Sequence, residues 1–195
     1  MSNKTESGFL IIADISGYTS YVARTELEHS QEVLAELLGL IVNHFQPMIN
    51  VLRLEGDAVF ANVPETQIPR GETLVEILET CYTAFRDHIR GIIQLTTCKC
   101  KACKAIPSLD LKFIVHYGEY IVQSVSGISE LVGSEVNRLF RLTKNQVKAA
   151  SGWDAYILYT QASAEKLGLE TGEMLELVET YEHLGDVTTY TVDLH

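Results

Sequence analysis

Apolar residues along the chain change their spacing several times, and each spacing predicts a type of element. Phe9–Ala13 form a continuous apolar run that ends at Asp14, which is typical of a buried strand. From Ser30 to Phe45 apolar residues recur every three or four positions, which predicts an amphipathic helix that Pro47 ends. A second helix of this kind is expected from about Glu72 to Leu95.

The segments around these helices predict a mixed α+β fold. Residues 49–54 and 58–63 are expected to form a tight hairpin around Glu55-Gly56-Asp57. The later pattern predicts strands at 109–117 and 119–125, a loop at 127–133, a helix at 135–149, a strand at 153–159, a short helix at 162–167, and a hairpin of 174–181 with 187–194. This order predicts a ferredoxin-like antiparallel sheet with helices on one face.

No repeat or linker divides the chain, so we expect one domain over residues 1–195. Its core is expected at about 8–194, with a cysteine-rich insert at about 96–108. The length of 195 residues and the 46% hydrophobic content suffice for one substantial core.

The charge balance narrows the range of partners. The formal net charge is -11, from 15 basic and 26 acidic residues, which argues against binding to nucleic acid or to anionic membranes. No apolar stretch approaches the roughly 18–20 residues that span a bilayer. The polar N-terminus has no signal-peptide core, so we expect a cytoplasmic location.

Two aspartates lie at predicted strand ends with a glycine nearby. Asp14 follows the first strand, and Asp57 belongs to the hairpin turn. Two carboxylates brought together in this way form a simple site for magnesium held against nucleotide phosphates. The alternative is that both aspartates serve only as turn or capping residues.

Four short motifs occur in an order that identifies a resemblance. They are Ala13-Asp-Ile-Ser-Gly-Tyr-Thr19, Gly56-Asp57, His116-Tyr-Gly118, and Gly133-Ser-Glu-Val-Asn137 followed by Arg141. Each motif alone is a weak signal, but in this order they resemble the class III adenylate/guanylate cyclase catalytic domain over about residues 8–192. This resemblance implies a ferredoxin-like fold and a homodimer.

The resemblance also implies roles for the matching residues. Asp14 and Asp57 would bind two Mg²⁺ or Mn²⁺ ions at the triphosphate. Asn137 and Arg141, which are four residues apart and hence on one helical face, would orient the ribose and stabilise charge at the α-phosphate. Backbone amides of one segment would cradle phosphate oxygens, and this segment includes Ile15, Gly17, Tyr18 and Thr19.

Base recognition is implied at two further positions. The resemblance places Arg53 where adenylate cyclases carry a purine-reading lysine, and Glu130 where they carry an aspartate. Arginine donates and glutamate accepts hydrogen bonds, which favours the adenine edge and therefore ATP over GTP. His116 is expected to be a structural histidine within its strand.

The last hairpin departs from the family pattern. Active members carry a lysine there that clamps the triphosphate, whereas Tyr181–Tyr190 contains none. Glu182 is nearest to that place and would repel phosphate, and His183 is a poor substitute near neutral pH. Two functions are therefore consistent with the sequence. One is a cyclase that converts ATP to cyclic AMP and pyrophosphate, and the other is a degenerate module that binds a nucleotide, a small ligand or a partner protein without catalysis.

Three cysteines lie close together in Thr97-Cys-Lys-Cys-Lys-Ala-Cys-Lys104. Cys98, Cys100 and Cys103 are suited to a soft ion such as zinc, which commonly takes four ligands. No fourth ligand is evident, because Cys81 and His88 fall on the apolar stripe of the preceding helix and are expected in the core. A redox-active thiol loop and a disulfide are the alternatives.

Overall fold

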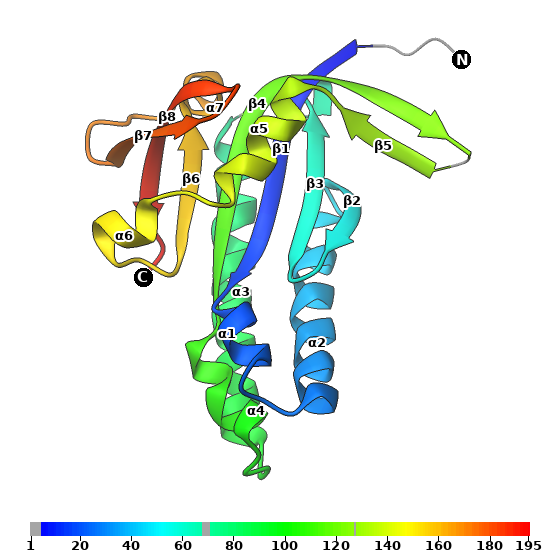
Figure 1. The fold of residues 1–195 in the computed structure, drawn as a ribbon, viewed down its shortest axis with the longest axis vertical. Helices are drawn as coiled ribbons and strands as arrows, with labels where there is room; N and C mark the ends of the chain where they lie inside the picture. Colours follow the sequence, from blue (N-terminus) through cyan, green and yellow to red (C-terminus); the bar gives the residue numbers. More distant parts are fainter. Residues whose placement is uncertain (1–4, 68–70, 127) are drawn as a thin grey trace.

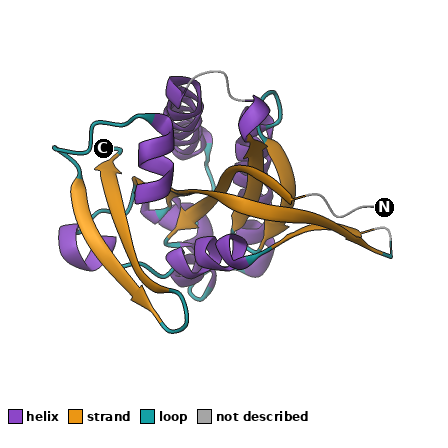
Figure 2. Ribbon diagram, turned by 90° about the horizontal axis from the view of Figure 1, so that it is seen from above, coloured by secondary structure: helices purple, strands orange, loops and turns teal. Residues whose placement is uncertain are grey.

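The computed structural model describes residues 5–67, 71–126 and 128–195, in which one sheet lies between helices (Figures 1 and 2). The elements are, in chain order, β1 (Thr5–Ser16), α1 (Tyr18–Val22), α2 (Leu27–Phe45), β2 (Asn50–Glu55), β3 (Ala58–Pro64), η1 (Glu65–Gln67), α3 (Gly71–Leu95), α4 (Lys101–Ala105), η2 (Ile106–Ser108), β4 (Asp110–Val125), β5 (Ile128–Val132), α5 (Ser134–Leu142), α6 (Val147–Ser151), β6 (Tyr156–Thr160), α7 (Gln161–Leu167), β7 (Leu175–Tyr181) and β8 (Gly185–Asp193).

The sheet has the strand order β2-β3-β1-β4-β6-β8-β7, and β5 pairs with β4. Its neighbouring strands are antiparallel except for the parallel pair β4–β6. Strand β1 lies between β3 and β4 and is buried on both faces, which explains its unbroken apolar run. The α+β fold class predicted from the sequence is confirmed.

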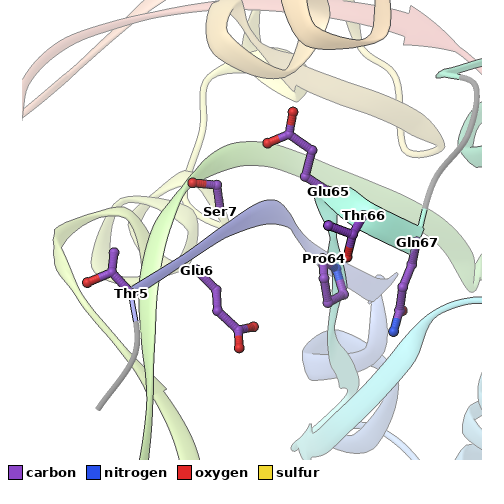
Figure 3. A pocket seen from close by; sticks show the side chains of 7 residues that line it. All are labelled: Thr5, Glu6, Ser7, Pro64, Glu65, Thr66 and Gln67. Atoms are coloured by element: carbon purple, nitrogen blue, oxygen red, sulfur yellow. The ribbon is translucent and has the colours of Figure 1, made fainter. Parts of the chain in front are cut away.

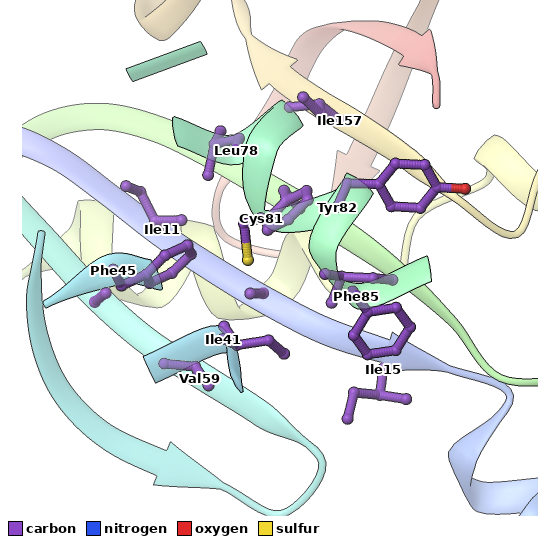
Figure 4. Close-up of a cluster of buried hydrophobic side chains, with 14 of the residues drawn as sticks. Ile11, Ile15, Ile41, Phe45, Val59, Leu78, Cys81, Tyr82, Phe85 and Ile157 are labelled. Carbon is purple, nitrogen blue, oxygen red and sulfur yellow. The ribbon is translucent and has the colours of Figure 1, made fainter. Parts of the chain in front are cut away.

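The core on one face of the sheet is built mainly by α2 and α3. Each helix turns a stripe of buried side chains toward the odd-numbered apolar residues of β1. Figure 4 shows Ile41 and Phe45 from α2 and Leu78 and Phe85 from α3 in one cluster with Ile11 and Ile15 of β1. Full burial of such side chains contributes about 1.5–3 kcal/mol each. No helix in the described part of the chain has the length and apolar character needed to cross a membrane.

Helix α5 covers the opposite face of the sheet. Its buried residues Val136, Leu139 and Leu142 join Leu10 and Ile12, the even-numbered residues of β1, in a second core cluster. The sheet therefore carries α2 and α3 on one face and α5 on the other.

Several predicted elements differ from the structure in their boundaries, and three of these differences have a clear cause in the contacts. The strand predicted to end at Gly118 continues through it, because Gly118 pairs with Gly8 and lies under α5, where a Cβ would be 2.6 Å from the Cγ of Glu135. The loop predicted at 127–133 contains β5, whose apolar residues do not alternate; residue 127 lies outside the described residues. The helix predicted at 135–149 is broken at Asn145, whose side chain donates to the Leu142 carbonyl and accepts from the Val147 amide.

Candidate functional site

The sheet brings Asp14 and Asp57 together. Asp14 lies near the end of β1 and pairs with Ala58, the residue that follows Asp57 in the β2–β3 hairpin. Gly56, at φ 65°, lets the hairpin turn, and the Ile15 amide donates a 3.1 Å hydrogen bond to the Asp57 carbonyl oxygen. The two carboxylates line the same two cavities.

These cavities differ in their other walls. One, of about 220 Å³, is partly apolar and includes Phe60 and Phe140. The other, of about 400 Å³, is lined by residues 16–20 and by two cationic side chains, Lys112 and Lys144. Space for an apolar ring and space for an anion therefore adjoin the same pair of aspartates.

The electrostatics of Asp14 favour a cation at this place. Burial raises the pKa of Asp14, the Lys112 ammonium lowers it, and the negative charge of Asp57 raises it, so that the pKa lies above its ordinary value. The Lys112 Nζ lies 3.4 Å from Asp14 Oδ2. One lysine thus does not offset the burial and the second carboxylate, and carboxylate oxygens are the ligands that Mg²⁺ prefers. The residues present fit a divalent ion.

The predicted phosphate-binding segment follows directly. Gly17 has φ 84° at the start of α1, and Gly17, Tyr18 and Thr19 line the cavity of about 400 Å³. The Ile15 amide already donates its hydrogen bond to the Asp57 carbonyl oxygen, so it is not one of the amides that could bind phosphate. A Cβ at Gly17 would lie 2.7 Å from the Ser108 carbonyl oxygen, so this segment packs closely on the chain that precedes β4.

Arg53 and Glu130, the predicted base-reading residues, form an ion pair. Arg53 Nη1 lies 3.3 Å from Glu130 Oε1, and Arg53 also pairs with Glu55. The guanidinium lies over the rings of Phe60 and Phe140, at 5.1 and 5.6 Å from their centroids. Because both rings line the cavity of about 220 Å³, the ion pair lies beside that cavity.

Asn137 and Arg141 are not brought to the aspartates within one chain. Both are exposed on α5, and neither lines the two aspartate cavities, whereas Phe140 and Thr143 of the same region do. The side chains predicted to act on ribose and α-phosphate are therefore presented outward.

His116 lies in a buried polar chain, as expected of a structural histidine. Its ring nitrogens contact the Thr160 hydroxyl at 2.8 Å and the Glu135 carboxylate at 2.7 Å. Burial lowers the pKa of His116 despite the Glu135 carboxylate. Burial acts to raise the pKa of Glu135, but the His116 hydrogen bond and the Arg138 charge outweigh it and lower that pKa.

The last hairpin presents no cation to the aspartate cavities. Glu182 and His183 lie at its turn, with side chains 89% and 87% exposed. The cavity of about 400 Å³ is instead lined by Lys112 and Lys144, which the sequence pattern did not identify. Lys112 could be found only from the register of β4 against β1, in which it stands opposite Asp14.

The cysteine cluster gains a histidine from a distant helix. The ligand atoms of His29, Cys98, Cys100 and Cys103 all lie within 4.8 Å of one another, an arrangement that could hold a metal ion. Hydrogen bonds from the Cys103 amide and from His29 lower the pKa of the Cys100 thiol to about 6. All four cysteines are free.

The two residues excluded as fourth ligands behave differently from each other. Cys81 is fully buried in the core, as expected, and burial raises the pKa of its thiol to about 12. His88 is half-buried rather than part of the core, and its Nε2 lies 2.8 Å from the Glu36 carboxylate on α2. His29 could not be identified as a ligand from local sequence, because it lies 69 residues before Cys98.

A further cavity, of about 590 Å³, lies between the start of β1 and the segment after β3 (Figure 3). It is lined by Glu6 and Glu65 and by five uncharged residues, and by none of the predicted site residues. Its charge does not suit a phosphate group.

Comparisons with solved structures define the class of fold. The chain superposes on the guanylyl cyclase Cya2 with a TM-score of 0.74 and 15% identity, covering 98% of this chain and 94% of that one. It superposes on a bacterial light-regulated adenylyl cyclase with a TM-score of 0.71 and 13% identity. The match covers all of this chain but spans only 54% of the light-regulated enzyme. The fold is therefore that of adenylyl and guanylyl cyclase catalytic domains.

Sequence comparison then gives the family. Residues 34–151 match the family described as "Protein of unknown function (DUF2652)", and the chain belongs to this family. It is also 28% identical over 165 residues to the uncharacterized protein Rv2561/Rv2562 of Mycobacterium tuberculosis, covering 83% of this chain and 73% of that protein.

Proposed function

We propose that this chain is a nucleotide cyclase-like domain that binds a purine nucleoside triphosphate, ATP in preference to GTP, together with Mg²⁺ or Mn²⁺. The observation that carries the proposal is the pair of aspartates, Asp14 and Asp57, lining both a partly apolar cavity and a cavity with two lysines. The cyclase fold supports it.

Each group of residues that lines the two aspartate cavities has a role in this proposal. Asp14 and Asp57 hold the divalent ion, which when bound lowers the pKa of the 3′-hydroxyl and neutralises phosphate charge. Lys112 and Lys144 attract the triphosphate, and the backbone from Gly17 donates to its oxygens. The cationic side chains thus offset the net charge of -11 where an anion must bind.

A second copy of the chain completes the site. Asn137 and Arg141 are exposed and separate from the aspartates of their own chain, so we infer that they act on the nucleotide held by the partner's aspartates. Exposed apolar side chains support such an interface: Leu54, on the edge strand β2, is 52% exposed, and Val122, on the β4–β5 arm, is 41% exposed.

Arg53 and Glu130 would read the base. Their ion pair holds a donor and an acceptor side by side, and the stacking of Arg53 on Phe60 and Phe140 fixes its plane. A donor next to an acceptor matches the adenine edge, which offers an acceptor and an amino group.

In the reaction, the 3′-hydroxyl would give its proton to solvent, assisted by the carboxylates of Asp14 and Asp57, and its oxygen would attack the α-phosphorus. The bond from the α-phosphorus to the oxygen that bridges to the β-phosphate would break, so that cyclic AMP and pyrophosphate would leave. Arg141 would stabilise charge that develops at the α-phosphate, and Asn137 would hold the ribose. The second candidate function is nucleotide binding without turnover. The exposed Glu182 and His183 favour it, since the resemblance places them nearest to the lysine that is expected to clamp the triphosphate in an active cyclase.

The experiment measures binding and turnover separately. Calorimetric titration with ATP and Mn²⁺ reports binding, and chromatography after incubation with ATP or GTP reports cyclic product. We expect Asp57→Asn to abolish metal-dependent binding and Asp87→Asn, an exposed carboxylate paired with Arg90, to leave it unchanged. Binding without product selects the second candidate, and no binding refutes both.

Mixing two inactive variants tests the shared site. A dimer of one Asp57→Asn chain and one Arg141→Ala chain has one doubly altered site and one intact site. Random pairing of equal amounts therefore restores roughly a quarter of the wild-type sites. No recovery would show that each site is built within one chain.

A further inference from the structure

We propose that His29, Cys98, Cys100 and Cys103 form a closed four-ligand zinc site that fastens the cysteine-rich insert to helix α2. Three ligands come from the segment around α4, and the fourth comes from the first turn of α2. The site lies outside the aspartate cavities and does not depend on nucleotide binding.

The distances fit tetrahedral zinc. With Zn–S near 2.3 Å and Zn–N near 2.0–2.1 Å, tetrahedral geometry separates a nitrogen and a sulfur ligand by about 3.6 Å. The Nδ1 of His29 lies 3.2 Å from the Cys100 sulfur and 3.9 Å from the Cys98 sulfur, on either side of that value. All ligand atoms lie within 4.8 Å, so small side-chain rotations close the set around one ion.

The donor set selects a soft or borderline ion over Mg²⁺. Thiolate and imidazole ligands suit zinc, and four protein ligands are typical of a structural rather than a catalytic site. The Cys103 amide donates to the Cys100 sulfur at 3.3 Å, which stabilises a thiolate. Zinc with three thiolates and a neutral imidazole carries one net negative charge. The same segment supplies three lysines to offset it, namely Lys99, Lys101 and Lys104.

The insert supports the candidate phosphate-binding segment. The Glu26 carboxylate accepts from the amides of Lys101 and Ala102, at 3.3 and 3.0 Å, which provides a second link between α2 and α4. Helix α1 also contacts α4. Beyond α4, the Ser108 carbonyl oxygen lies where a Cβ on Gly17 would clash. An ion that fixes the insert therefore also fixes the backbone on which Gly17 rests.

Metal content tests the ligand set. We expect protein purified without chelator to hold about one zinc per chain by elemental analysis. His29→Ala should lower zinc content by about tenfold or more after dialysis, whereas His29→Cys, which keeps a soft ligand, should retain it. The matched control is His44→Ala on the same helix, since the ring of His44 contacts the Leu40 carbonyl of its own helix and lies outside the cysteine cluster.

A folding defect is separated from ligand loss by Co²⁺ substitution. Cobalt-loaded wild-type protein should show the thiolate-to-cobalt absorption of a tetrahedral site, and folded His29→Cys should show it shifted by the added sulfur. Reduced, metal-free cysteines or a disulfide in protein grown with zinc would overturn the proposal. So would a zinc content that His29→Ala leaves unchanged.

Hydrogen exchange tests the supporting role. Removing zinc with a chelator should increase amide hydrogen exchange in residues 15–25 and 98–108. It should not do so in β8 and β7, the last two strands at one edge of the sheet. Unchanged exchange in residues 15–25 after complete zinc removal would refute the support of the phosphate-binding segment.

Discussion

Gly17→Ala is the sharpest single test of how the candidate phosphate-binding segment is held. Gly17 has φ 84°, a left-handed conformation that costs an L residue about 1–2 kcal/mol. The new Cβ would also lie 2.7 Å from the backbone oxygen of Ser108, which cannot rotate away as a side chain would. Forcing such overpacking costs a further ~1–3 kcal/mol. We therefore expect a loss of about 2–5 kcal/mol in the free energy of unfolding.

Thermal unfolding followed by circular dichroism measures this loss. For a chain of 195 residues, each kcal/mol shifts Tm by about 2–4 °C, so a fall of roughly 4–20 °C is expected. Gly91→Ala is the matched control, because a Cβ at this position in α3 meets nothing within 4 Å. Its expected effect has the opposite sign, a gain of up to about 1 kcal/mol from better helix propensity.

Comparing the two variants shows whether the loss of stability comes from the contact between Gly17 and Ser108. If Gly17→Ala is as stable as the wild type, the segment after Asp14 is not held against Ser108. Equal losses in both variants would mean that the effect belongs to alanine substitution in general and not to this contact.

Two further predictions concern pH. Asp14→Asn should raise Tm in metal-free buffer at neutral pH, because burial and the charge of Asp57 raise the pKa of Asp14 and make its ionised form unfavourable in the folded protein. This gain in Tm should shrink as the pH falls toward 3.8, the ordinary pKa of an aspartate. No gain at neutral pH would contradict the burial argument. His116→Asn should cost about 1–3 kcal/mol at pH 7.5 in urea unfolding. Because burial lowers the pKa of His116, the contribution of its neutral ring to stability is present above the ordinary pKa of 6.5 and is lost as the pH falls. The wild type and His116→Asn should therefore be closer in stability at acidic pH. A difference in stability that stays constant with pH would refute this.

The sequence predicts well where one periodicity extends over many residues. The stripes of α2 and α3 and the apolar run of β1 each bury many side chains, so local pattern and tertiary environment agree. The sequence-based prediction of an element fails where a tertiary contact determines the local structure. Gly118 resembles a strand end, but it is glycine because Glu135 lies against it. The short strand β5 exists only because β4 extends far enough to pair with it.

The candidate site divides in the same way. Asp14 and Asp57 each lie at a predicted strand end with a glycine nearby, which local sequence shows, and the sheet brings them together. Lys112 depends on the register between two strands, and His29 depends on the packing of α2 against an insert 69 residues away. Neither register nor packing is encoded in local spacing, so these residues could be found only in the structure.

The two candidate ion sites share one short stretch of chain, from Asp14 to His29, and this explains why an insert would be useful here. Helix α1 has five residues, has Gly17 as its N-cap without a side-chain hydrogen bond, and is too short to be stable alone. Its order must come from packing, and the insert is one of the elements that it contacts. Oxygen ligands at Asp14 and sulfur ligands in the insert select different ions, so Mg²⁺ at the first would not displace zinc from the second. A zinc-fastened insert would therefore hold the phosphate-binding segment in place while leaving the carboxylates free for the nucleotide-bound metal.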